Sequence, residues 1–248
     1  AEVPPDASRA CFAGAYYRKA VSSMDHWDGI EGEVTLPEIE FDPDRWDGAR
    51  GKYLDNPSIY MGGRAGPQEI DCGLTWSPTK DEFGIISTEG RAFRPFWRNE
   101  TWHNAALNPD LYFYPGDKVK MRCAVTSSGK MELVVTLVSR KTSGVPAITP
   151  LPFRVEFDAA SFGPDKIQEF KRVDAIDQVG NEGKPAVATD TRVVSAKWEK
   201  VILLRNGQKL PFNASRFTDM RCPTPSTIAV APIPNDESGE TITIDGAK

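Results

Sequence analysis

Two carboxylates in one alternating stretch are the first residues whose types and spacing point to chemistry. Residues 69–76 alternate between polar and apolar side chains, as a half-buried β-strand requires. This alternation places Glu69 and Asp71 on the same polar face. Two carboxyls on one face can raise the pKa of one of them, as general acid–base catalysis requires. The alternative is a solvated strand face, neutralised by Arg64, Lys118 or Arg122.

Aromatic and basic side chains near this stretch have the chemistry of a sugar-binding surface. The apolar CH face of a pyranose ring packs on an aromatic plane, and arginine can hold its hydroxyls by paired hydrogen bonds. Trp76 shares the apolar face of its strand, which favours a place in the core. The candidate ligand-binding residues are Tyr60, Arg94, Trp97, Arg98, Trp102 and His103.

The sequence gives little support for metal or histidine chemistry. Its two histidines, His26 and His103, lack the spacing of a zinc site or of a nearby Ser-His-Asp triad. Asp42, Asp44 and Asp47 could bind calcium, but their loop lacks the full EF-hand pattern. A turn held by Asx hydrogen bonds is the expected structure, and no metal or cofactor is expected.

Four cysteines, Cys11, Cys72, Cys123 and Cys222, allow three pairings if all are bridged. Their long spacings fit neither a zinc knuckle nor a redox CxxC motif. Cys72 and Cys123 fall on apolar strand faces, so two buried free thiols are the alternative to a bridge between them.

Composition excludes several classes of partner. Acidic residues outnumber basic ones and the net charge is -5, so no nucleic-acid partner is expected. No run approaches the roughly 20 apolar residues that a membrane-spanning helix needs. A first residue other than Met and two glycosylation acceptor patterns, at Asn99 and Asn213, favour a secreted or otherwise extracytoplasmic protein.

The elements that must position these side chains are almost all short strands. The clearest are residues 117–126 and 131–138, which form a hairpin around the turn at 127–129. The candidate carboxylates belong to a second hairpin, Ser58–Trp76, whose turn contains Gly62, Gly63 and Gly66. Further strands are expected at residues 33–41, 91–98, 153–157, 170–176 and 193–204, with a turn at Asn206-Gly207.

Other segments are expected to be irregular. Residues 9–24 have the pattern of a short helix or a winding arm, and residues 77–90 and 142–152 that of connections. We therefore expect one domain over residues 1–248, with residues 1–32 as an N-terminal arm. With roughly ten to twelve strands and little helix, its fold class is all-β, a two-sheet antiparallel sandwich of the concanavalin-like jelly-roll type.

Three segments resemble the glutamic peptidases called eqolisins, which fold as a bent two-sheet sandwich. The segments are residues 59–76, the hairpin that starts at Tyr114 and turns at 127–129, and the strand 170–177. The family's catalytic pair is a glutamine and a glutamate. The resemblance implies Asp71 in the place of the glutamine and Asp174 or Asp177 in that of the glutamate. Because a carboxylate cannot donate to an oxyanion as an amide does, the family's mechanism would not carry over unchanged.

The tripeptide Glu69-Ile70-Asp71 also resembles the opening of the Glu-x-Asp-x-x-Glu signature of laminarinase- and lichenase-type glycosidases. Those retaining enzymes need two carboxyls roughly 5 Å apart on one strand. Leu74 and Thr75 occupy the place of the second glutamate, so the acid/base of that template is missing.

The sequence therefore favours an extracytoplasmic sandwich that either binds or cleaves a polysaccharide or other glycan through a groove lined by carboxylates and aromatic residues. The alternative is a glutamic-peptidase-like acid hydrolase that uses Asp71 with Asp174 or Asp177. A structural domain without a small-molecule site is the third interpretation. Oligomeric state is left open.

Overall fold

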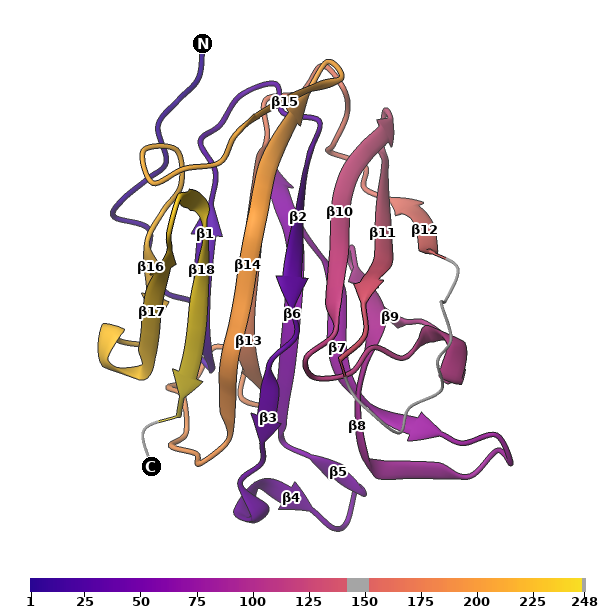
Figure 1. Ribbon diagram of the computed structural model, residues 1–248. Coiled ribbons are helices and arrows are strands. Elements are labelled where there is room, and N and C mark those ends of the chain that lie inside the picture. The colour runs from indigo at the N-terminus through magenta and orange to yellow at the C-terminus, as the bar shows by residue number, and fades with distance from the viewer. Residues whose placement is uncertain (142–151, 247–248) are drawn as a thin grey trace.

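Two antiparallel β-sheets packed face to face form the protein in a computed structural model, which describes residues 1–141 and 152–246 (Figure 1). In the seven-stranded sheet the order is β16 (Met220–Cys222), β1 (Ala15–Val21), β13 (Glu169–Gln178), β6 (Asp55–Ala65), β7 (Gln68–Lys80), β8 (Ile86–Arg98) and β9 (Trp102–Asn104). The expected all-β sandwich is confirmed. Its sheets face each other across one continuous apolar core.

The nine-stranded sheet has a main path of seven strands: β12 (Phe153–Asp158), β11 (Lys130–Ser139), β10 (Lys118–Ser127), β2 (Gly29–Thr35), β14 (Arg192–Arg205), β18 (Asp236–Asp245) and β17 (Ile228–Ile233). Two short strands, β3 (Glu38–Glu40) and β15 (Gln208–Pro211), also pair with β14. β4 (Trp46–Asp47) and β5 (Lys52–Tyr53) form a separate small hairpin. The helices of the described chain are three 3₁₀ turns, η1 (Pro43–Arg45), η2 (Pro109–Leu111) and η3 (Pro225–Thr227), and none in that part is long and apolar enough to cross a membrane.

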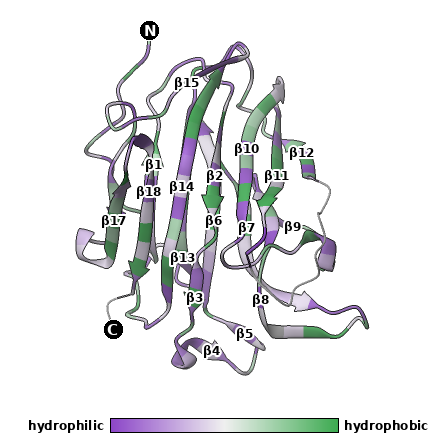
Figure 2. Cartoon of the chain, in the orientation of Figure 1, coloured by the Kyte–Doolittle hydropathy of each residue, from purple (hydrophilic) through white to green (hydrophobic). Residues whose placement is uncertain are grey.

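Alternation along the strands builds the core. In the β10–β11 hairpin, Val119, Met121 and Cys123 are fully buried and lie opposite Leu137, Val135 and Leu133, as the sequence pattern predicts. Figure 2 shows the resulting interleaving of hydrophobic and hydrophilic residues along the strands. The predicted turn at Asn206-Gly207 is also confirmed, because both residues have positive φ between β14 and β15.

Two predictions for irregular segments are wrong. Residues 9–24 contain strand β1, which lies inside the seven-stranded sheet rather than in a helix or a loose arm. Residues 77–90 continue β7 and begin β8, so these two strands form one long hairpin. The connection predicted at residues 142–152 lies almost entirely outside the described residues.

The aspartate-rich loop forms the expected Asx turn. The Asp42 side chain accepts a hydrogen bond at 2.9 Å from the backbone N–H of Asp44 and so caps η1. Asp47 makes the same kind of bond to the N–H of Ala49 at 3.0 Å.

One disulfide joins Cys11 to Cys222 across a sequence separation of 211 residues. It fastens the segment before β1 to β16, at the edge of the seven-stranded sheet. Cys72 and Cys123 are free and buried, and burial raises the pKa of the Cys72 thiol well above its ordinary value. Of the alternatives left open by the sequence, the structure therefore selects one bridge and two inert thiols.

We expect the double variant Cys11→Ser/Cys222→Ser to lose about 3–5 kcal/mol of unfolding free energy, because the bridge closes a long loop in the unfolded chain. Urea unfolding with and without reductant measures the effect. Reductant should lower the midpoint of the wild type and leave that of the variant unchanged. Equal midpoints for the oxidised wild type and the variant would contradict the prediction.

Candidate functional site

The outer face of the seven-stranded sheet, which points away from the nine-stranded sheet, carries the candidate carboxylates. Cross-strand pairing sets its rows: Lys171 on β13 lies opposite Gly62 on β6, Gly62 opposite Asp71 on β7, and Asp71 opposite Arg98 on β8. Lys19 on β1 belongs to the same face. Residues from five strands therefore meet on one surface.

Lys171 is the centre of an ion-pair cluster on this outer face. Its side chain is only 4% exposed, and its ammonium bonds to Glu69 Oε1 at 2.8 Å and to Asp71 Oδ1. Arg98 donates twice to Asp71 Oδ2, at 2.7 and 2.9 Å, and Lys19 reaches Glu69 at 3.0 Å. Every carboxylate oxygen named here has a charged partner.

Gly62 makes this cluster possible by leaving space above β6. A Cβ at that position would lie 2.1 Å from the backbone oxygen of Ile70 and 3.0 Å from Lys171 Cε. Its φ is not positive, so the glycine is required for close approach rather than for a turn; Gly66, at φ +54°, provides the turn. The turn role predicted for Gly62 and Gly63 is therefore wrong.

The ion-pair cluster lowers the pKa values of Glu69 and Asp71, whereas the sequence predicted that one of them would rise. Burial alone would raise both carboxyl pKa values, but attraction by Lys171, joined by Lys19 at Glu69 and by Arg98 at Asp71, outweighs it and lowers both. The pKa of Lys171 is raised, because the attraction of Asp71 and Glu69 outweighs its own burial. The two carboxyls therefore stay ionised, and the predicted rise in the pKa of one of them is wrong.

The neutralising partners also differ from the predicted ones. Arg64 pairs with Glu169, Lys118 with Glu199, and Arg122 with Glu31. The actual partners come from β1, β8 and β13, which only the sheet register brings to β7. Sequence reasoning missed Lys19 and Lys171 because neither lies near the carboxylates in the chain.

Asp177 is a carboxyl on the outer face whose pKa lies well above the ordinary value for aspartate. Burial, followed by repulsion from the Asp71 carboxylate, raises its pKa to about 7. Within the described part of the chain, no hydrogen bond or ion pair reaches its side chain. Asn56 lies directly opposite it across β6 and β13 and donates from its amide to Thr75 Oγ1 at 3.0 Å. An amide and a carboxyl with a raised pKa are therefore cross-strand neighbours.

Asp174 lies on the opposite face of β13, between the two sheets. It is 0% exposed, and Trp198 Nε1 donates to its Oδ1 at 2.8 Å, while its Oδ2 has no partner in the described structure. Burial raises its pKa to about 7 as well. Asp174 and Asp177, equivalent in the sequence resemblance, therefore differ: only Asp177 shares a face with Asp71.

The predicted ligand-binding residues are divided between the two faces of the seven-stranded sheet. Trp102 stacks on Phe96 with ring centroids 4.3 Å apart, and Tyr60 meets Phe96 edge-on at 5.7 Å, so these rings form a row on the outer face. On that face Arg94 donates to the backbone of Ala105. Trp97 and His103 stack on each other at 5.5 Å and belong to the other side of their strands. The structure therefore does not gather all six residues into one groove.

No group of three or more His, Cys, Asp or Glu side chains arranged to hold a metal ion occurs among the described residues. The outer face offers an ionised carboxylate at Asp71, a carboxyl at Asp177 that is protonated below about pH 7, and an amide at Asn56. This set can supply a general base, a general acid and a hydrogen-bond donor.

Comparison with solved structures shows the same fold in glutamic peptidases. A scytalido-glutamic peptidase with a peptide-based transition-state analogue matches 92% of this chain and 97% of its own, with a TM-score of 0.58 and 8% identity. Its complex with another transition-state analogue inhibitor gives a TM-score of 0.59 at 7% identity. An eqolisin-family peptidase in complex with the tripeptide Ala-Ile-His gives 0.54 at 10% identity, with the same coverage. The predicted resemblance to the eqolisin fold is confirmed.

At sequence identities this low, the structural matches establish the fold and no more. No protein-family model matches the sequence, and no curated protein matches it.

Replacing Lys171 with Met should destabilise the protein by about 3 kcal/mol, because two carboxylates would lose a buried partner. Urea unfolding at pH 7 measures the change. The matched control is Lys184→Met, an exposed lysine that should change stability little. Similar stability of both variants would contradict the central role of Lys171.

The raised pKa of Asp174 predicts a pH dependence of stability. Between pH 4 and pH 7 the folded protein holds a proton on Asp174 that the unfolded chain has released, so the stabilisation is complete below about pH 4 and is lost as pH rises to about 7. In Asp174→Asn, the decrease in unfolding free energy between pH 4 and pH 7 should be smaller than in wild type by roughly 2–4 kcal/mol. Urea unfolding at pH 4 and pH 7.5 tests it, with exposed Glu100→Gln as control. An unchanged pH dependence in Asp174→Asn would contradict the prediction.

Proposed function

We propose that the protein is a hydrolase of the glutamic-peptidase type that cleaves peptide bonds at acidic to neutral pH, using Asp71 and Asp177. The observation that carries the proposal is a pair of carboxyls on one sheet face whose pKa values are driven apart. Such a division assigns the base to the ionised group and the acid to the protonated one. The fold shared with peptidases supports the class of reaction.

In the proposed reaction, water attacks the carbonyl carbon of a peptide lying across the outer face. Asp71 accepts the proton of that water, and Asp177 gives its proton to the departing amine nitrogen as the C–N bond breaks. The Asn56 amide, opposite Asp177, donates to the carbonyl oxygen as negative charge develops there. Proton exchange with solvent restores both carboxyls.

The ion-pair cluster has a positioning role in this proposal. Lys171 and Arg98 keep Asp71 ionised in acid and fix both of its oxygens. The Asp71 carboxylate in turn raises the pKa of Asp177. Acid and base are thus set by the same group of side chains.

Carbohydrate recognition is the second candidate function, favoured by the row of rings on the outer face. Trp102 is 40% exposed although its ring is stacked on Phe96, so it offers a flat apolar surface to solvent. Pyranose rings pack on such surfaces. Loss of saccharide binding in Trp102→Ala would support this function.

We also propose an extracytoplasmic location. The Cys11–Cys222 disulfide supports it, because structural disulfides persist in oxidising compartments. Thiol labelling of protein taken directly from its native compartment should find this pair oxidised.

Peptide hydrolysis should require protonated Asp177, so the rate should be constant below about pH 7 and fall about tenfold per unit above it. A quenched-fluorescent peptide library assayed from pH 4 to pH 9 measures this. Asp71→Asn and Asp177→Asn should each lower kcat at least about 100-fold.

Two controls separate this proposal from its alternatives. Asp110→Asn changes an exposed aspartate and should keep full activity, and Asp174→Asn should keep activity because its side chain lies between the sheets. Absence of hydrolysis by folded wild type, or equal activity of Asp177→Asn, would overturn the proposal.

A further inference from the structure

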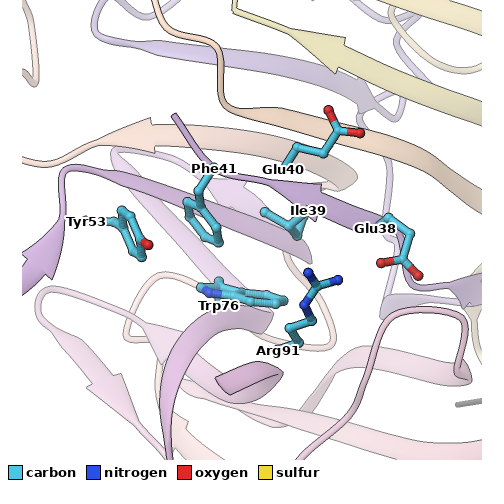
Figure 3. Close-up of a pocket in the computed structure, with 7 residues that line it drawn as sticks. All are labelled: Glu38, Ile39, Glu40, Phe41, Tyr53, Trp76 and Arg91. Carbon is cyan, nitrogen blue, oxygen red and sulfur yellow. The ribbon is translucent and has the colours of Figure 1, made fainter. Parts of the chain in front are cut away.

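A pocket at one end of the sandwich lies apart from the outer face. Its volume is about 590 Å³, and it lies between β3 of the nine-stranded sheet and β7 and β8 of the seven-stranded sheet (Figure 3). Its lining residues are Glu38, Ile39, Glu40, Phe41, Tyr53, Trp76 and Arg91. None of them belongs to the proposed hydrolytic site.

Three aromatic rings form one wall of this pocket. Phe41 stacks on Tyr53 with centroids 4.3 Å apart, and Trp76 lies 5.5 Å from Phe41. Phe93, fully buried, supports Trp76 from the core at 5.2 Å. All three wall rings remain partly exposed, so they present an apolar surface held in place from behind.

The contacts among the rings decide what kind of ligand this wall suits. An aromatic cage for a methylated ammonium group needs rings that surround an empty centre. Phe41 touches both of its neighbours, which leaves no space between the rings for a cation. The wall instead suits a ligand with an apolar face that lies against it.

The mouth of the pocket carries opposite charges that are not neutralised. Glu38 and Arg91 are both exposed, and within the described structure neither forms an ion pair or a side-chain hydrogen bond. Glu40 pairs with Arg192 at 3.3 Å, and Figure 3 shows its carboxylate directed away from the rings. Acceptor and donor groups therefore remain available beside the aromatic wall.

We propose that this pocket binds a pyranose ring of a neutral saccharide. The CH face of the sugar would pack on the aromatic wall, while its hydroxyls donate to Glu38 and accept from Arg91. An apolar amino-acid side chain would pack on the wall but would use neither charged group, whereas hydroxyls can hydrogen-bond to both. A neutral ring rich in hydroxyls satisfies both parts of the pocket.

This saccharide site is independent of the proposed hydrolysis and of the Trp102 surface. Residues of the pocket come from β3, β5, β7 and β8 and include neither Asp71 nor Asp177. A chain with both sites would hold a saccharide at one end of the sandwich and act on another ligand at the outer face. Hydrolysis and saccharide binding can therefore be tested separately.

Isothermal titration with cellohexaose, laminarihexaose, xylohexaose and mannohexaose tests the proposal, and a Phe-containing tripeptide amide represents the competing ligand class. Wild type should bind at least one saccharide. Arg91→Gln and Tyr53→Ala should each weaken that binding about tenfold, through loss of a charged donor and of wall surface respectively. Trp102→Ala, on the outer face, should leave it unchanged.

Each other outcome overturns the proposal. The first such outcome is that folded wild type binds none of the four saccharides. The second is that Arg91→Gln and Tyr53→Ala bind the saccharide as tightly as wild type does. The third is that wild type binds only the tripeptide amide. Arg91→Gln changes an exposed side chain, so it should fold even if Tyr53→Ala does not. Its peptide-cleaving activity should equal that of wild type, which distinguishes failure of this site from failure of the hydrolase.

Discussion

The register of β13 between β1 and β6 is the constraint on which both faces of the seven-stranded sheet depend. It places Lys171 opposite Gly62 and Asp177 opposite Asn56. A slip of one residue would exchange the faces and send Lys171 into the apolar core and Asp174 outward. Burial of Phe170 and Ile176 between the sheets opposes such a slip. The outer-face chemistry is therefore fixed by packing on the inner face.

Strand β13 also carries two aspartates, Asp174 and Asp177, whose roles differ because they lie on opposite faces of the sheet. Asp174 and Asp177 both have pKa values raised to about 7 by burial, yet one lies beside Trp198 in the core and the other shares a surface with Asp71. Only a group that a substrate can reach can transfer a proton to it. The buried carboxyl affects stability, whereas the outer carboxyl carries the proposed chemistry.

Much of the fold could be predicted from sequence because most strands have one apolar face. The β10–β11 hairpin alternates cleanly, and its alternating side chains are buried as expected. β1 was missed for a physical reason: Tyr17 and Val21 pack into a small second cluster on the outer face, so the strand is buried on both sides and loses its alternation. Alternation of apolar and polar residues reveals a strand only where one of its faces is buried and the other is exposed.

The site was less predictable than the fold. Glu69 and Asp71 were correctly placed on one face, but their pKa values depend on Lys171, about a hundred residues further along the chain. Asn56 gave no local signal either, because its relation to Asp177 exists only in the register of β6 and β13. Long-range pairing, which sequence patterns do not specify, decides which polar groups meet.

The most direct test of this account is the titration of the Asp177 side-chain carboxyl, followed by ¹³C NMR in wild type and in Asp71→Asn. The account predicts a midpoint of about 7 in wild type and a lower midpoint in the variant, because the Asp71 charge contributes to the shift. A wild-type midpoint near the ordinary aspartate value of about 4 would contradict it. So would a midpoint that Asp71→Asn leaves unchanged.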